Sequence, residues 1–250
     1  MTAPVPPTRG YAICAEARAG TIYLCRLLAS TGQLGRPAEY FHTPERARAL
    51  RSDPESELAK IASEAATPNG VYGLKLFSAH FDLVAKTGWV ERLPGLAFVH
   101  VRRRDLLGQA VSLARAIQTR QYKAADAAVG EPRYDPDLIA DCLARTAYGQ
   151  ARWECWFARN GLDPLRLDYE DVVAGPEAAV AAVAQRLWIE GAPAVDWSQI
   201  ELRVQRDEKS EDWRRRFAAE RGDRAYLDGG RLFSRWRRGP AFARFFLGGR

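Results

Sequence analysis

The chain has 250 residues, of which 47% are hydrophobic and 27% charged, and this balance is typical of a globular protein with one sizeable core. No stretch is apolar for long enough to cross a bilayer, so we expect no stable membrane insertion. The formal net charge of +6 fits a nucleic-acid partner, an acidic membrane surface or a small polyanionic ligand, and composition leaves these three open.

In chain order, short β-type runs alternate with longer helical patterns. The expected strands are 11–15, 70–76, 97–102 and 165–169. The expected helices are 21–31, 45–65, 105–119, 136–160 and 176–187. This alternation predicts the α/β class, with a mostly parallel sheet flanked by helices in a single domain that spans residues 1–250.

Three stretches differ from this pattern. Residues 1–10 are typical of a flexible lead-in and lack the features of a signal peptide, so we expect a cytoplasmic protein. Residues 125–136 form the best loop candidate. Residues 218–250 form a basic C-terminal extension rich in aromatic residues, which fits either a surface or partner-binding helix or a terminus packed on its own domain.

The cysteines bear on compartment and metal binding. Cys14, Cys25, Cys142 and Cys155 lie in apolar patterns without metal-ligand spacing. This arrangement favours buried free thiols in a reducing compartment, with no disulfide and no zinc or other metal.

The first expected strand ends in a short glycine turn. Residues 11–24 read YAICAEARAGTIYL, an apolar run followed by a turn and the start of a helix. Such a turn directs backbone N–H groups at the positive end of a helix dipole, and there Arg18 adds a charged fork and Thr21 a hydroxyl. The turn suits a phosphate or sulfate, although an ordinary strand-to-helix turn is the alternative. Glu16 would repel that anion unless its carboxylate points away or pairs with a cation.

The third expected strand repeats this logic. Arg102, Arg103 and Arg104 follow its apolar run, and Asp105 is a suitable N-cap for the next helix. Ligands of open α/β sheets lie outside the carboxyl ends of the strands, so two anion sites would share one edge of the sheet. A nucleotide with phosphates at both ends would fit this edge, and the alternative is a solvated strand end.

Five blocks in order then resemble one family from Tyr11 to about Phe217: ARAGTIYL, TGQLGRPAEYF, TPNGVYGLKLF, HVRRRDLLGQAVSLARAIQT and QRDEKSEDWRRRF. The chain is similar to sulfotransferases of the trehalose 2-sulfotransferase (Stf0-like) type. The resemblance implies a nucleotide-kinase-like α/β fold that binds 3′-phosphoadenosine 5′-phosphosulfate (PAPS) and moves its sulfuryl group to a hydroxyl. A kinase is not expected, because the chain lacks the G-x-x-x-x-G-K-[ST] phosphate loop.

The resemblance also implies roles for single residues. Glu39, in RPAEYF, stands in the place of the family's catalytic glutamate and would be the general base. The 5′-phosphosulfate would be held by Arg18, which also stabilises the leaving phosphate, with Ala19, Gly20, Thr21 and Ile22. The 3′-phosphate would be held by Arg103 and Ser112.

Two further residues have open roles. Lys75 either faces the leaving group or only extends toward solvent, and Trp213 either packs near the adenine or fills core.

Departures from the family pattern limit the acceptor. Ala17 stands where the trehalose enzyme has a glutamine that reaches the sugar, and residues 42–66 do not match its disaccharide-binding loop. Gly108 replaces a serine in the 3′-phosphate helix. We therefore expect an acceptor other than trehalose, either another small hydroxylated molecule or another sugar, with no nucleic-acid partner.

Two other functions stay open. Glu16 fits a nucleotide-binding homologue with altered or lost chemistry, and the charge and C-terminal extension fit a basic nucleic-acid or membrane-surface binding protein. A homodimer is compatible with the pattern.

Overall fold

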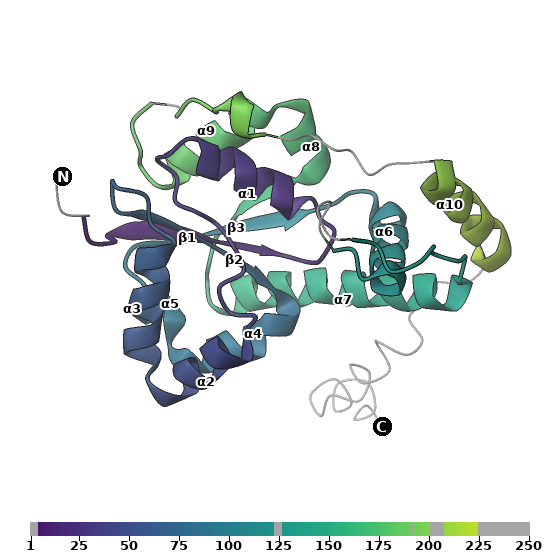
Figure 1. Ribbon diagram of the computed structural model, residues 1–250, viewed down its shortest axis with the longest axis horizontal. Coiled ribbons are helices and arrows are strands. Elements are labelled where there is room, and N and C mark those ends of the chain that lie inside the picture. Colours follow the sequence, from purple (N-terminus) through teal and green to yellow (C-terminus); the bar gives the residue numbers. More distant parts are fainter. Residues whose placement is uncertain (1–4, 123–126, 192, 201–207, 225–250) are drawn as a thin grey trace, which may run out of the picture.

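The computed structural model describes residues 5–122, 127–191, 193–200 and 208–224. Over these residues the centre of the fold is a sheet of four parallel strands in the order β2-β1-β3-β4 (Figure 1). The strands are β1 (Arg9–Ala15), β2 (Val71–Phe77), β3 (Leu96–Arg102) and β4 (Leu165–Asp168). The predicted α/β class and parallel sheet are confirmed, and each strand end lies within two residues of its expected place.

Helices cover both faces of this sheet. Their bounds are α1 (Thr21–Ser30), α2 (Pro44–Ser52), α3 (Pro54–Glu64), α4 (Ser78–Val84), α5 (Trp89–Arg92), α6 (Leu106–Thr119), α7 (Pro136–Arg159), α8 (Tyr169–Ala174), α9 (Pro176–Arg186) and α10 (Glu208–Arg221). Short 3₁₀ turns occupy Ala85–Thr87 and Trp197–Gln199. In Figure 1, α1, α8 and α9 lie above the sheet, whereas α3, α4, α5 and α7 lie below it.

The single helix expected at 45–65 was wrong, because the chain forms α2 and α3 there. Pro54 disfavours helical backbone at the preceding residue, and Asp53 indeed has φ −144° and ψ 83°. The Asp53 side chain also accepts a hydrogen bond from the amide of Ser56, which caps α3.

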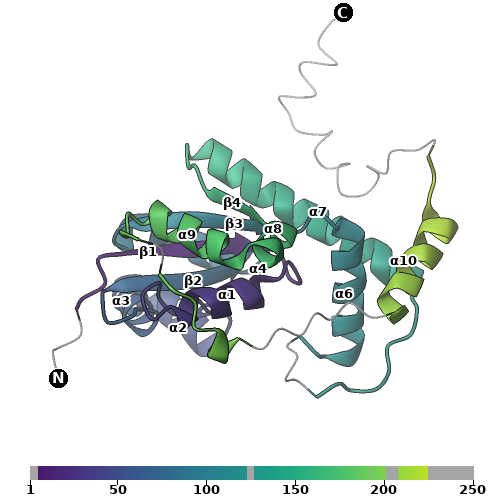
Figure 2. The same cartoon turned by 90° about the horizontal axis from the view of Figure 1, so that it is seen from above.

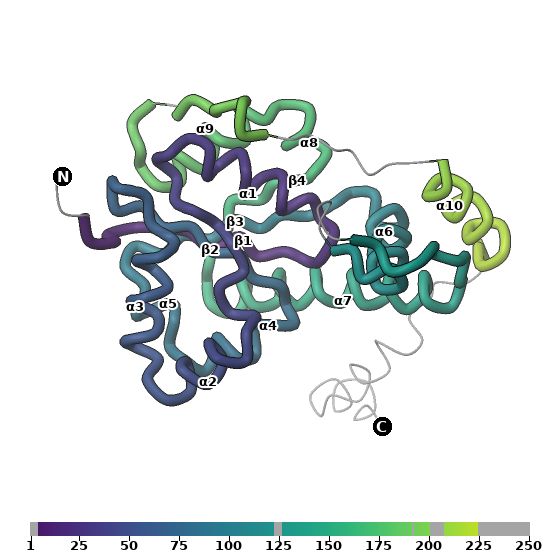
Figure 3. Tube along the Cα trace, viewed as in Figure 1, coloured from purple at the N-terminus to yellow at the C-terminus, as the bar shows by residue number. Residues whose placement is uncertain are grey.

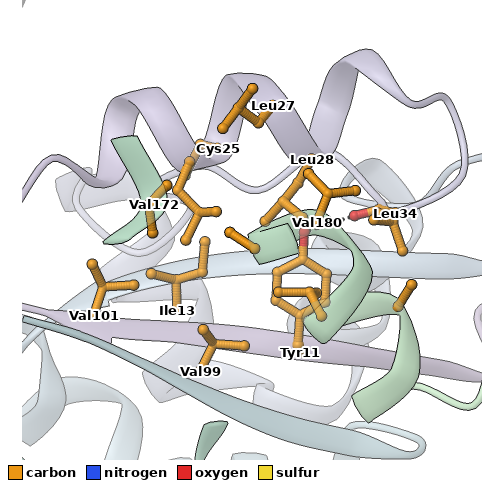
Figure 4. Packing of buried hydrophobic residues seen from close by; sticks show 14 of the residues in the cluster. Tyr11, Ile13, Cys25, Leu27, Leu28, Leu34, Val99, Val101, Val172 and Val180 are labelled. Carbon is orange, nitrogen blue, oxygen red and sulfur yellow. Dashed lines mark hydrogen bonds between the residues drawn. The ribbon is translucent and has the colours of Figure 1, made fainter. Parts of the chain in front are cut away.

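Two apolar clusters hold the sheet between its helices. Tyr11, Ile13 and Ala15 point into a cluster with α1 and α9, and the intervening Ala12 and Cys14 point into a second cluster with α3 and α7. This alternation follows from the two-residue period of a strand. Figure 4 shows the first cluster, in which the Tyr11 hydroxyl donates to the carbonyl of Leu34 at 2.7 Å.

A third apolar cluster lies beyond the carboxyl ends of the strands. There α6 and α10 pack against each other and against α7, as the two views in Figures 1 and 2 show. This end of the molecule carries the residues that follow β1 and β3.

The described ends of the chain differ from the sequence-based expectation. Arg9 and Gly10, expected in the lead-in, are part of β1, and the amide of Thr8 donates to Gly70 O at 3.1 Å. The start of the expected C-terminal extension is the last turn of α10, whereas residues 225–250 lie outside the described residues. Within the part of the chain that is described, no helix is long and apolar enough to span a membrane.

Cys14, Cys25 and Cys142 are buried free thiols, as predicted. Cys155 is exposed, so the prediction that it is buried was wrong. It lies on α7, whose buried residues include its near neighbours Trp153 and Phe157. An amphipathic helix buries only one stripe of its surface, which leaves Cys155 on the solvent side.

Candidate active site

The two predicted anion sites share one edge of the sheet. Strands β1 and β3 are neighbours, and their register pairs Ala15 with Val101 at their carboxyl ends. Residues 16–20, here named the anion loop, and the three consecutive arginines therefore leave the sheet side by side. The strand order also reverses between β1 and β3, and open α/β sheets bind ligands outside such a switch point.

The anion loop has a left-handed backbone at two positions. Arg18 has φ 66° and Gly20 φ 77°. A Cβ atom on Gly20 would lie 2.0 Å from the ring of Tyr169, so the glycine is needed for space as well as for conformation. The amides of Thr21 and Ile22, in the first turn of α1, have no acceptor within their own helix. This geometry suits the backbone cradle that the sequence predicts.

The first helical turn and the loop differ in exposure. Ala19 and Thr21 are buried, and the amide of Ala19 donates to Glu16 O at 3.3 Å. Ile22 is 36% exposed. The side chain of Ile22 thus faces outward at the helix start, whereas Ala19 contributes to the core.

Arg18 reaches from the anion loop to Ser112 of α6 and to Tyr122 beyond the end of that helix. Its Nε donates to Ser112 Oγ at 2.9 Å, and one terminal nitrogen donates to Tyr122 O at 2.6 Å. Burial lowers the pKa of Arg18, and the nearby cations Arg103 and Arg115 lower it further. The structure thus brings together three predicted residues, Arg18, Arg103 and Ser112, and a group of cations of this kind would suit an anion.

The three consecutive arginines have different surroundings. Arg102 pairs with Asp168 at 3.1 Å, and Arg104 forms a two-nitrogen contact with Asp171 at 2.7 and 2.9 Å. Arg103 instead turns toward the anion loop, where it donates to Arg18 O at 3.4 Å. Its guanidinium also lies 5.4 Å from the ring centre of Tyr169. Arg103 is thus the arginine of this run that faces the candidate site.

Asp105 caps α6, as predicted, and occupies space beside Gly108. Its carboxylate accepts the Gly108 amide at 2.9 Å, and a Cβ atom on Gly108 would lie 2.2 Å from Asp105 Oδ2. The same carboxylate pairs with Arg214 of α10 at 2.8 Å and lies 3.7 Å from Arg103. A serine at position 108 would not fit this arrangement.

Trp213 is 3% exposed and packs in the cluster formed by α6, α7 and α10. Its ring meets Tyr134 edge-on, with 5.9 Å between ring centres. The tryptophan therefore fills core, and a contact with adenine stays a prediction.

Glu39 and Lys75 form an ion pair beside β2. The stretch between α1 and α2 passes beside β2 (Figure 3), where Ala38 pairs with Leu74 and accepts the amide of Lys75 at 2.9 Å. Lys75 Nζ lies 2.7 Å from Glu39 Oε1, and the two side chains are 7% and 27% exposed. Lys75 does not extend to solvent, so that alternative is wrong.

His80, which the sequence analysis did not single out, interacts electrostatically with both members of the Lys75–Glu39 pair. It is half-buried on α4, and burial lowers its pKa, with Glu39 acting in the opposite direction. His42 and Lys75 also influence it electrostatically. His80 could have been found from the sequence, because it lies in FSAHF just after β2. Residues that follow a strand end lie at the edge of the sheet where ligands bind.

Glu16 turns away from the predicted anion site. The residue is 8% exposed, and its carboxylate accepts the amide of Ser78, the first residue of α4, at 3.3 Å. A glutamate beside an anion was expected only if its carboxylate points away or pairs with a cation, and the first of these two conditions applies here.

Two buried side chains hold the backbone at the end of β1, and sequence reasoning missed both. Gln109 Nε2 donates to Ala17 O at 2.8 Å, and Trp153 Nε1 donates to Ala15 O at 3.1 Å. Gln109 lies on α6 and Trp153 on α7, and both helices are far from the anion loop in sequence. Local sequence patterns therefore did not indicate these two contacts. Among the described residues, no group of three or more histidine, cysteine or acidic side chains could hold a metal ion.

Comparisons with known proteins identify the family of this chain. The family described as Stf0 sulphotransferase matches residues 10–220. A trehalose 2-sulfotransferase of Mycobacterium tuberculosis is 26% identical over 259 aligned positions, which cover 85% of this chain and 95% of the relative. A trehalose 2-sulfotransferase of Mycolicibacterium smegmatis is 24% identical, with coverage of 83% and 93%.

A solved structure, the sulfotransferase domain from the Synechococcus PCC 7002 olefin synthase, matches with 16% identity and a TM-score of 0.40. The match covers 87% of this chain and 98% of that domain. The family match extends over most of the chain and includes the anion loop, β3 and all of α10 but its last residue. The protein therefore belongs to the Stf0 sulphotransferase family.

Proposed function

We propose that the protein transfers the sulfuryl group of PAPS to a hydroxyl of a small molecule or carbohydrate, with Glu39 as the general base. The observation that carries this proposal is the convergence of Arg18, Arg103 and Ser112 at the carboxyl ends of β1 and β3. Lys75 lies on the neighbouring strand β2 and pairs with Glu39 of the stretch that passes beside this strand. This arrangement offers a cationic edge for a nucleotide and a carboxylate beside it.

In the proposed reaction the acceptor oxygen attacks sulfur while the bond between sulfur and the bridging phosphate oxygen breaks. The acceptor proton goes to Glu39, and the bridging oxygen keeps the electron pair as 3′-phosphoadenosine 5′-phosphate (PAP) leaves. The protein's main tasks are to align the acceptor with the donor and to stabilise the charge on the leaving phosphate. Arg18 and the amides of Thr21 and Ile22 would perform the second task.

Arg18 already donates to Ser112 and Tyr122, and a guanidinium has five N–H donors in all. A phosphate bound beside it would accept charge-assisted hydrogen bonds from this group and bring an opposite charge to it.

The acceptor is expected to be a hydroxylated small molecule. The two relatives are named for transfer to trehalose, which supports an acceptor of this general kind. Ala17 differs from the glutamine expected in a trehalose enzyme, and it packs against the apolar cluster of α6 and α7. We therefore propose an acceptor other than trehalose.

The alternative of a homologue with lost chemistry rested on repulsion between Glu16 and the donor. The Glu16 carboxylate is buried beside Ser78, so that repulsion loses its basis. The alternative of a nucleic-acid or membrane-surface protein rested partly on residues 225–250, which lie outside the described residues.

The test measures transfer of radiolabelled sulfate from PAPS to a panel of sugars, lipids and small alcohols. Glu39→Gln keeps a hydrogen-bond acceptor for Lys75 and should lower the single-turnover rate by about 10²–10⁴-fold with little change in PAP affinity. Glu45→Gln, an exposed carboxylate on the nearby helix α2, is the matched control and should transfer normally. Absence of both labelled product and PAP binding in the native protein would contradict the proposed function.

A further inference from the structure

Glu16 is the first residue of the anion loop, yet its carboxylate does not face solvent. The residue is 8% exposed, and Oε1 accepts the amide of Ser78 at 3.3 Å. Burial raises the pKa of Glu16, while hydrogen bonds from Ser78 and the charges of Arg145 and Arg152 act in the opposite direction. A carboxylate in such a place needs partners that hold it there.

Gly149 provides the space for this carboxylate. A Cβ atom on Gly149 would lie 2.2 Å from Glu16 Cδ and 2.4 and 2.5 Å from its two oxygens, and these are its three nearest atoms. Gly149 lies inside the 24-residue helix α7, where glycine is less favourable than alanine. The Glu16 side chain thus explains sterically why a glycine is needed at position 149.

The partner on the other side is the end of β2. Ser78 directly follows β2 and begins α4, and its carbonyl accepts from Arg152 of α7 at 3.2 Å. Arg152 also pairs with Asp82 of α4 at 2.9 Å. Glu16, Ser78 and Arg152 therefore link the end of β1, the end of β2 and α7.

We propose that Glu16 is a positioning residue, which fixes the anion loop relative to the end of β2, the strand whose Lys75 pairs with Glu39. The inference rests on the proposed function, since β1 supplies the donor side and β2 the acceptor side. A sulfuryl transfer needs these two sides in line, and a displacement of about 1 Å can cost about 100-fold in rate.

Two substitutions at Glu16 distinguish the effect of its hydrogen bond with Ser78 from the effect of its charge. Glu16→Gln retains an oxygen that can accept the Ser78 amide, and it should keep the single-turnover rate within about threefold of native. Glu16→Ala removes that acceptor and should lower the rate about 10- to 100-fold. Rates are measured at saturating PAPS and well below the melting temperature of every variant.

Gly149→Ala perturbs the same contact from the helix side. In the native background the new methyl collides with the carboxylate, so both the melting temperature and the transfer rate should fall. In the Glu16→Ala background the methyl has room, and Gly149→Ala should leave the melting temperature unchanged or raise it, because alanine favours the helix. Glu57→Ala, which removes a carboxylate of similar burial on α3, should lower the melting temperature and leave the rate unchanged.

The results either support or overturn the inference. A Glu16→Ala variant that transfers at the native rate would overturn it, and so would a Glu16→Gln variant that falls as far as Glu16→Ala. Equal losses of melting temperature from Gly149→Ala in both backgrounds would show that the carboxylate is not seated against α7. This temperature comparison needs no activity, so a failure of the proposed function remains distinguishable.

Discussion

Arg103→Ala should remove most of the protein's preference for a nucleotide with a 3′-phosphate. The Arg103 side chain is 16% exposed, and within the described residues its buried Nε has no hydrogen-bond partner. Asp105, 3.7 Å away, is held more closely by Arg214 at 2.8 Å. Arg103 therefore has donor capacity that the protein itself does not use, and a bound phosphate would use it.

The size of the effect follows from the kind of bond. A hydrogen bond to a charged group contributes about 1.5–3 kcal/mol, which corresponds to a loss of about 10- to 150-fold in affinity. The loss should appear for PAP and be nearly absent for adenosine 5′-phosphate, which has no 3′-phosphate. Native protein and variant are compared by calorimetric titration with both nucleotides at one salt concentration.

The neighbouring arginines are the controls. Arg102→Ala breaks the pair with Asp168, and Arg104→Ala breaks the contact with Asp171, so both remove the same charge from the chain. Each should leave the PAP affinity within about twofold, because exposed ion pairs contribute little and neither group faces the anion loop. Equal losses for PAP in all three variants, or equal losses for both nucleotides in Arg103→Ala, would refute the reasoning.

Three more outcomes follow from the anion loop. Arg18→Ala should weaken PAP binding by about 10-fold or more with little change in melting temperature, and an unchanged affinity in calorimetry would remove Arg18 from the site. Gly20→Ala should lower the free energy of unfolding by about 1 kcal/mol or more in urea denaturation, because a side chain at φ 77° is strained and would meet the Tyr169 ring; a change below about 0.5 kcal/mol would contradict this. Because the folded-state pKa of Glu16 is raised, the folded protein holds a proton that the unfolded chain has lost, and this contribution to stability disappears as pH rises from 4.5 through the raised value. Glu16→Gln has no carboxyl group that could lose a proton, so the urea midpoint of this variant should rise relative to that of the native protein between pH 4 and pH 8. A constant difference between the two midpoints would contradict the account.

Much of this arrangement could be predicted from local sequence. The strand cores, the glycine turn after β1 and the N-cap at Asp105 depend on residues close together in the chain. The convergence of Arg18 and Arg103 was also predictable in outline, because the carboxyl ends of neighbouring parallel strands meet at one edge of the sheet.

The direction of the Glu16 side chain was not predictable in this way. It depends on Gly149, which is 133 positions later in the chain, and on Ser78 at the start of a helix. Helices α4 and α8 have 7 and 6 residues, too few for a clear 3.6-residue period, and α4 carries the missed residue His80. Trp213 shows the same limit, because an apolar ring in a sequence can fill core or face a ligand.

Solving a crystal structure of the protein with PAP would test the central claim most directly. We predict that the 5′-phosphate binds the amides of Thr21 and Ile22 together with Arg18, and that the 3′-phosphate lies within hydrogen-bonding distance of Arg103 and Ser112. Glu39, paired with Lys75, should then lie on the side of the 5′-phosphate that the anion loop does not cover. PAP bound elsewhere, or a 5′-phosphate remote from the anion loop, would contradict the account.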